Sequence, residues 1–157
     1  MANFEMELFR VENPLIALQN FAHKIVRERN PLIIGITGSV GKTTTKELIK
    51  SVLSQQFQVF ATHGNLNNHI GVPLSLLSIT KKHQVAIIEM GANHQKEIEF
   101  LCSLSQPDIG LITNIGKAHL EGFGGPEGVI KGKSELYDYL KANDKFIFVN
   151  TDDEKHL

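Results

Sequence analysis

Short apolar runs alternate with segments of helical periodicity along most of the chain. Asn13-Pro14 is typical of a helix start, because asparagine caps a helix and proline fits its first turn, and apolar residues then recur at helical spacing as far as Arg29. The pattern beyond predicts strands at 32–36, 58–61, 85–90, 109–112 and 146–149, helices at 97–104 and 127–140, and a further helix whose Leu48, Ile49, Val52 and Leu53 share one face. Short strands that alternate with helices predict an α/β fold, a mostly parallel sheet with helices on both faces.

The composition argues against a disordered, a nucleic-acid-binding and a membrane-spanning protein. We expect one domain at residues 31–157, preceded by a tail and a helix at 1–30, because 41% of the residues are apolar and 21% are charged. A net charge of −1 provides no field toward nucleic acid or an anionic membrane, and no apolar run approaches the roughly 20 residues of a membrane span. The single cysteine, Cys102, fits a reducing compartment and is expected to pack beside Ile98. We therefore expect a cytoplasmic domain without nucleic-acid binding or membrane insertion.

The sequence GITGSVGKTT, residues 35–44, lies between the first strand and the first long helix. Glycines let backbone N–H groups converge on an anion at a helix N-terminus, Lys42 would reach the β- and γ-phosphates, and the Thr43 hydroxyl would bind Mg²⁺. The strict phosphate-loop pattern is not met, because Ile36 stands where its first glycine would be. A guanine-reading N-K-x-D sequence is absent, which disfavours a GTPase. We interpret this loop as a triphosphate site that by itself does not separate kinases, motor ATPases and ligases.

Three further residues have positions that suit a nucleotide site. Glu89 ends a buried strand, where the carboxyl edge of a parallel sheet binds ligands, although such an acid can also cap the following loop. His119 lies with Glu121 in a long glycine-rich loop and is either a metal ligand or a structural histidine. Lys133 falls on the apolar arc formed by Val129, Ile130, Leu136, Tyr137 and Leu140, whereas Lys131 and Asp138 point the other way. A lysine on such an arc either reaches the helix edge or is paired or chemically altered.

Together with this loop, the strings GNLNNHIGVP, IEMGANHQKEI and TNIGKAHLEGFG resemble the Mur ligase family, the ATP-dependent amino-acid and peptide ligases of bacterial cell-wall precursor synthesis. The resemblance runs from about Phe9 to Val149 and implies the phosphate-loop-containing central domain of that family. The strings are most similar to the branch that joins D-Ala-D-Ala to UDP-N-acetylmuramoyl-tripeptide. That reaction proceeds through an acyl phosphate and converts ATP to ADP and phosphate.

The resemblance also implies roles for individual residues. Lys42, His119 and Lys133 would be catalytic, with Lys133 carbamylated by CO₂ into a carboxylate-like anion. Two Mg²⁺ ions would be held by Thr43, Glu89, His119 and the modified Lys133. Nucleotide contacts would come from Thr37, Gly38, Ser39, Val40, Gly41, Lys42, Thr43, Thr44, Asn68 and Asn114. Asn93 and His94 would line the site without an assigned role, and His69 stands where an aspartate is expected.

The chain is short for this family, whose members carry an N-terminal domain that grips the UDP-sugar and a C-terminal domain that brings the acceptor. We therefore expect a central domain truncated at its C-terminus and inactive as a ligase by itself. The alternatives are another family member such as folylpolyglutamate synthase, a phosphate-loop kinase, and a nucleotide-binding module without catalysis of its own. The NNHIGVP and GANH strings favour the D-Ala-D-Ala branch over the folate enzyme.

Overall fold

The computed structural model describes residues 8–116 and 120–152, which form five strands and six helices. The strands are β1 (Leu32–Thr37), β2 (Val59–Ala61), β3 (Val85–Glu89), β4 (Ile109–Ile112) and β5 (Phe146–Phe148). The helices are α1 (Pro14–Arg29), α2 (Lys42–Leu53), α3 (Gly71–Ser78), α4 (Glu97–Ser105), α5 (Leu120–Phe123) and α6 (Pro126–Ala142). Each strand that the sequence predicts is present, with ends that differ by at most one residue. No helix in the described part of the chain is long and apolar enough to cross a membrane.

The five strands form one parallel sheet in the order β2-β3-β1-β4-β5. The central strand is β1, in which Ile34 pairs with Ile87 of β3 on one side and with Ile109 of β4 on the other. The strands that follow β1 in sequence lie first on one side of it (β2 and β3) and then on the other (β4 and β5). In open α/β sheets, ligands bind at the carboxyl ends of the strands where the strand order reverses in this way. The loop at residues 38–41 leaves β1 at this point.

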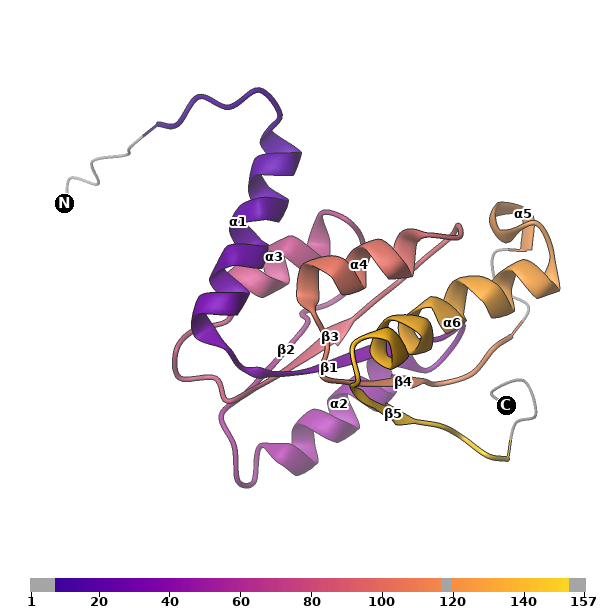
Figure 1. The fold of residues 1–157 in the computed structure, drawn as a ribbon. Helices are drawn as coiled ribbons and strands as arrows, with labels where there is room; N and C mark the ends of the chain where they lie inside the picture. Colours follow the sequence, from indigo (N-terminus) through magenta and orange to yellow (C-terminus); the bar gives the residue numbers. More distant parts are fainter. Residues whose placement is uncertain (1–7, 117–119, 153–157) are drawn as a thin grey trace.

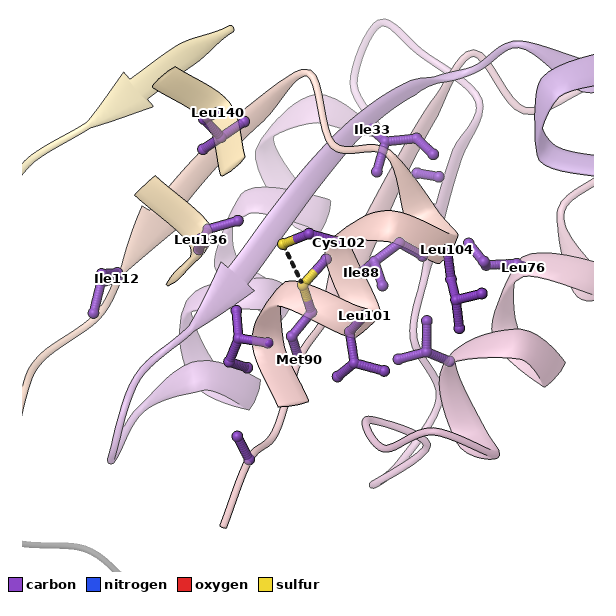
Figure 2. Close-up of a cluster of buried hydrophobic side chains, with 14 of the residues drawn as sticks. Ile33, Leu76, Ile88, Met90, Leu101, Cys102, Leu104, Ile112, Leu136 and Leu140 are labelled. Carbon is purple, nitrogen blue, oxygen red and sulfur yellow. Dashed lines mark hydrogen bonds between the residues drawn. The ribbon is translucent and has the colours of Figure 1, made fainter. Parts of the chain in front are cut away.

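Helices cover both faces of the sheet, as the sequence predicts, but unequally. Among the described helices, α1, α3, α4 and α6 pack on one face, and α2 packs on the other (Figure 1). Figure 2 shows the main core between the sheet and the larger group of helices, where Ile33 and Ile88 meet Leu101 and Leu136. Cys102 is buried there with Ile98, as expected, and its Sγ lies 3.8 Å from the sulfur of Met90. Burial raises the pKa of the Cys102 thiol, which keeps it protonated and unreactive.

Two details of the helices differ from the expectation. Of the four apolar residues expected to share one face of α2, Ile49 and Leu53 pack against the sheet, but Leu48 and Val52 are 64% and 70% exposed, so the apolar face is only partly the buried one. The third residue facing the sheet is Lys46, and since 46, 49 and 53 follow helical spacing, the buried face is rotated about 100° from residues 48 and 52. Ile130 likewise lies at the edge of its arc in α6 and is exposed.

The helix α3 is not among the predicted elements, because its start lies inside the amide-rich segment interpreted as a loop. The side-chain oxygen of Asn68 accepts hydrogen bonds from the N–H groups of Ile70 and Gly71, at 3.1 and 2.8 Å. Pro73 occupies the first turn, where its missing N–H costs nothing. An asparagine followed by an apolar run with an early proline is therefore the signal that predicts this helix.

Candidate functional site

A cavity of about 550 Å³ opens at the carboxyl ends of β1 and β3. Its walls come from the loop after β1, the residues after β2 and β3, the first turns of α4, and Lys133 of α6. The structure thus brings together Gly38, Ser39, Lys42, Asn68 and Lys133 of the residues assigned to the site from sequence. A larger groove of about 810 Å³ beside α2 is lined mainly by apolar side chains, with no titratable group among the described residues that line it. Of these two, the cavity at the ends of β1 and β3 is therefore the one whose described lining residues include titratable groups.

The loop between β1 and α2 has the backbone geometry of an anion-binding loop. Gly38 and Gly41 have φ angles of 144° and 81°, conformations that favour glycine. A Cβ at Gly38 would also overlap the hydroxyl of Thr113. As in any α-helix, the N–H groups of the first turn of α2 have no partner within the helix, and the N-cap residue, Gly41, has no side chain to accept from them. These groups carry the positive end of the helix dipole. This arrangement favours a phosphate at the start of α2.

The tip of this loop is joined to the residues that follow β4. The N–H of Ser39 donates to the backbone oxygen of Asn114 at 3.1 Å, and the N–H of Val40 donates to Asn114 Oδ1 at 3.1 Å. The carbonyl of Val40 accepts from Asn114 Nδ2 at 3.0 Å and from Thr113 Oγ1 at 2.6 Å. The N–H of Gly116 donates to Ser39 Oγ at 3.0 Å. Asn114 therefore contacts the loop backbone itself.

Lys42 is half-buried at the start of α2, and its Nζ donates to the carbonyl of Gly38 at 2.7 Å. Burial lowers the pKa of Lys42, and the nearby Glu89 carboxylate opposes that shift. Thr37 is fully buried at the end of β1, where its hydroxyl donates to the carbonyl of Met90 at 2.9 Å. The lysine lines the cavity, whereas Thr37 joins the ends of two adjacent strands.

Glu89 at the end of β3 and Thr43 in the first turn of α2 bring two side-chain oxygens together. The Thr43 hydroxyl donates to Glu89 Oε2 at 3.0 Å, and Asn67 Nδ2 donates to Glu89 Oε1 at 3.0 Å. Behind the carboxylate lies Lys46, which is 1% exposed, with its Nζ 3.8 Å from Glu89 Oε2 and 2.6 Å from the carbonyl oxygen of Thr62. Asn67 and Lys46 are contacts that the sequence analysis missed. The signal for Asn67 is an amide next to Asn68, whereas the sequence offers none for Lys46, because it does not show which side of α2 faces the sheet.

The geometry of this pair suits a hard divalent cation. A hydroxyl and a carboxylate are the protein oxygens that Mg²⁺ accepts beside phosphate and water. The described residues contain no cluster of three or more histidine, cysteine, aspartate or glutamate side chains that could hold a metal by themselves. A cation at Thr43 and Glu89 would therefore complete its coordination with ligand and water oxygens. His119, the expected ligand of a second ion, lies outside the described residues.

Lys133 points into the cavity and is only 2% exposed, whereas Lys131 is exposed, as the helical periodicity predicts. Its Nζ donates to the carbonyl of Ala92 at 3.3 Å and lies 5.3 Å from the centroid of the Phe123 ring. Burial lowers the pKa of Lys133 to about 8, and the positive charge of Lys42 adds to that shift. The nearby carboxylates Glu97 and Glu135 act in the opposite direction. An amine with this pKa has a substantial neutral fraction near pH 8.

Two carboxylates hold the segment that follows β3. Glu97 Oε2 accepts from the N–H groups of Asn93 and His94 at 2.6 and 3.1 Å. Burial raises the pKa of Glu97, but these bonds and His94 outweigh burial and lower it overall. From α6, Glu135 accepts from the N–H groups of Lys96 and Glu99 at 2.6 and 3.0 Å, and so caps α4. The sequence analysis missed Glu135, which at about 100° per residue lies nearly opposite Lys133 on α6 and outside its apolar arc, although it is buried.

The remaining assigned residues are placed as follows. The side-chain oxygen of Asn68 is engaged by the start of α3, while the residue lines the cavity. His69 and Asn93 also line the cavity, and the backbone oxygen of His69 accepts from Gln19 Nε2 at 3.0 Å. Glu121 is exposed in α5. The structure therefore unites the phosphate loop, Glu89 and Lys133 around one end of the sheet.

Known proteins resemble this chain in both sequence and fold. The model of the Mur ligase middle domain matches residues 36–157. The UDP-N-acetylmuramoyl-tripeptide–D-alanyl-D-alanine ligase of Bacillus subtilis is 42% identical over 139 residues, which are 88% of this chain and 30% of that protein. The ligase of the same name from Haemophilus influenzae is 47% identical over 137 residues, 85% of this chain and 30% of that protein.

Among solved structures, MurF from Acinetobacter baumannii superposes with a TM-score of 0.81 at 41% identity, covering 88% of this chain and 31% of that one. MurF from Thermotoga maritima in complex with ADP gives a TM-score of 0.78 at 35% identity, covering 88% of this chain and 32% of that one. The chain thus spans about 30% of the length of the proteins that it matches.

Proposed function

The chain belongs to the Mur ligase family, and from that premise we propose that it is the ATP-binding part of a ligase that joins D-Ala-D-Ala to UDP-N-acetylmuramoyl-tripeptide. The observation that carries the proposal is the convergence of the phosphate loop, the Thr43–Glu89 pair and the buried Lys133 at one end of the sheet. Relatives named for this reaction are 40–47% identical, which supports the choice of branch. ATP and UDP-linked sugars are cytoplasmic metabolites, so we place the reaction in the cytoplasm.

The proposed reaction has two balanced steps. The terminal carboxylate of the tripeptide attacks the γ-phosphorus of ATP, which forms an acyl phosphate and releases ADP. The amine of D-Ala-D-Ala then attacks the activated carbonyl carbon, forms the amide bond, and releases phosphate and the amine proton. In the first step, Lys42 and the N–H groups at the start of α2 hold phosphate oxygens in place and compensate the charge that develops on them.

Thr43 and Glu89 are the residues that would hold a Mg²⁺ ion beside the phosphates. Bound there, the ion would withdraw charge from the β- and γ-phosphate oxygens during transfer. The chain itself contributes a hydroxyl and a carboxylate 3.0 Å apart, with Asn67 on the opposite carboxylate oxygen. Asn67 and Lys46 thus fix the orientation of Glu89 before a cation arrives. Our proposal for a second ion at His119 rests on the family resemblance.

Lys133 is the residue proposed to react with CO₂. Its neutral amine attacks the carbon of CO₂ and loses a proton, which gives a carbamate anion. This step is more favourable for a buried amine with a pKa of about 8 than for an exposed lysine, because a larger fraction of the buried amine is neutral near pH 8. The resulting anion would lie in the cavity lined by Lys42, whose positive charge would stabilise it.

An assay of a polypeptide of full ligase length that carries this chain tests the proposal. We expect formation of the pentapeptide product only when ATP, Mg²⁺, UDP-N-acetylmuramoyl-tripeptide and D-Ala-D-Ala are all present. Phosphate release with folate and glutamate in place of the last two substrates would instead indicate a folylpolyglutamate synthase. Nucleotide binding without product in any substrate combination would identify a binding module and overturn the proposal.

A further inference from the structure

The tip of the phosphate loop has its conformation set by hydrogen bonds and not by packing. The Val40 side chain is 67% exposed and therefore contributes little apolar packing to the tip. Gly38 and Gly41 flank it with positive φ angles, and glycine gives the backbone unusual freedom at both ends. A segment of this kind moves readily unless polar groups hold it.

Asn114 supplies most of these polar contacts. Its amide oxygen accepts the N–H of Val40 and its amide nitrogen donates to the carbonyl of the same residue, at 3.1 and 3.0 Å. The side chain thus binds both backbone groups of Val40, as a neighbouring strand would. Its own carbonyl accepts the N–H of Ser39 at 3.1 Å, and Thr113 Oγ1 adds a second donor to the Val40 carbonyl at 2.6 Å.

Because of these contacts, the backbone N–H groups at the tip of the loop and those at the start of α2 differ in whether they are free to bind a phosphate. The N–H groups of Ser39 and Val40 are already occupied by Asn114, whereas those in the first turn of α2 have no partner within the helix. Phosphate oxygens would therefore meet Lys42 and Thr43 at the start of the helix. The tip would form a fixed wall beside them.

We propose that Asn114 is a positioning residue, which holds the tip of the phosphate loop in its nucleotide-accepting conformation before any nucleotide binds. This role differs from the direct nucleotide contact that the family resemblance implies for Asn114. The effect on nucleotide affinity rests on the proposed function, but the effect on the conformation of the loop does not. The two effects are therefore measured separately.

The first measurement is amide hydrogen exchange of the nucleotide-free chain, followed by NMR. Asn114→Ala should accelerate exchange of the Val40 amide about tenfold, because two hydrogen bonds to that residue are lost. Exchange of the Ile87 amide in β3 should stay unchanged, which reports that the core remains folded. Asn143→Ala is the matched control, since Asn143 also donates through Nδ2 to a backbone carbonyl, that of Tyr139 at 2.8 Å, but lies at the far end of α6. An unchanged Val40 amide in Asn114→Ala would overturn the proposal.

A milder pair of variants covers the case in which Asn114→Ala unfolds the chain. Thr113→Ala removes the hydroxyl that donates to the Val40 carbonyl, whereas Thr113→Ser keeps it. We expect faster exchange at Val40 and Ser39 in the alanine variant and near-normal exchange in the serine variant. Equal exchange rates in the two variants would contradict a loop held by polar contacts after β4.

The second measurement is the dissociation constant for Mg-ADP by calorimetry. Asn114→Ala should weaken binding about tenfold, in parallel with the faster exchange at Val40. Weaker binding with an unchanged Val40 amide would mean that Asn114 contacts the nucleotide directly, and tighter binding would mean that it competes with phosphate. Either result overturns the proposal. If the parent chain binds no nucleotide, the proposed function fails, and hydrogen exchange still decides whether Asn114 positions the loop.

Discussion

At the scale of single residues, the charged side chain of Lys42 is held in place by the backbone of the loop that precedes it. Its ammonium group is 2.7 Å from the carbonyl oxygen of Gly38, so the side chain folds back over the loop it would serve. We expect Lys42→Ala to abolish Mg-ATP binding and to leave the fold intact, because it removes a phosphate contact and little core packing. Calorimetric titration measures the binding and circular dichroism checks the fold.

The control for this variant is Lys50→Ala, in the last turn of the same helix. It removes an equal charge from α2 far from the start of the helix, and Mg-ATP affinity should stay within about twofold of the parent. Equal affinity of Lys42→Ala and the parent would refute the assignment of the phosphate loop.

Lys133 is buried and Lys131 is exposed on the same helix, so we expect their replacement by alanine to affect ligase activity differently. In a polypeptide of full ligase length, Lys133→Ala should lose most of the activity, with partial rescue by formate or acetate, whose carboxylate replaces the oxygens of the carbamate. Lys131→Ala changes an exposed residue and should be nearly silent, within about 0.5 kcal/mol in stability. Product formation at saturating ATP is the measurement. Damage by the Lys131 variant, or full activity of Lys133→Ala, would show the assignment to be wrong.

Burial of Lys133 also predicts how stability depends on pH. Its folded-state pKa of about 8 lies below the 10.5 of a free lysine, so between these values the unfolded chain binds more protons than the folded chain. The free energy of unfolding therefore rises with pH across this window. Below pH 8 Lys133 is charged in both states, and burial of that charge lowers the free energy of unfolding by its full amount. We expect Lys133→Met to be more stable than the parent by about 1–3 kcal/mol at pH 7, with the advantage shrinking toward pH 10.5. Urea unfolding at several pH values tests this, with Lys131→Met as the control.

At the scale of elements, Glu135 joins α6 to the start of α4. Its two carboxylate oxygens accept the N–H groups of Lys96 and Glu99, and it therefore caps a helix whose first turn lines the cavity. Glu135→Ala should lower the free energy of unfolding by about 1–2 kcal/mol, because it leaves two partly buried donors without partners. Glu135→Gln should cost less, since one acceptor oxygen remains. Equal stability of the alanine variant and the parent in urea would contradict the capping role.

The alternation of strands and helices was predictable because a parallel sheet buried on both faces needs continuous apolar strands. Helical spacing predicted the place of Lys133 on an apolar arc, but it left open whether the side chain reaches the helix edge or stays buried. The rotation of α2 was not, because Leu48 and Val52 match Ile49 and Leu53 in character, and only tertiary packing selects Lys46 as the third buried position. Asn67 and Glu135 were missed because their partners, Glu89 and the start of α4, are distant in sequence.

At the scale of the whole molecule, one sheet brings each part of the proposed nucleotide site to its carboxyl edge. The loop after β1 would provide the phosphate contacts, the end of β3 provides Glu89, and the residues after β4 donate and accept hydrogen bonds at the tip of the loop. These parts are adjacent because β3 and β4 flank β1, although they are far apart along the chain (Figure 1). The sheet order therefore explains why short motifs spread over about a hundred residues lie close together.

The size of the cavity predicts the limit of what this chain does alone. A volume of about 550 Å³ suits one ligand of nucleotide size, and the proposed reaction also needs the UDP-linked tripeptide and D-Ala-D-Ala held in line for attack. The chain spans about 30% of the length of relatives named for this reaction. We therefore expect the isolated chain to fold and to bind Mg-ADP, but to release no phosphate that depends on both other substrates. A phosphate-release assay beside a full-length relative measures this, and substrate-dependent release at a rate similar to that of the relative would contradict the prediction.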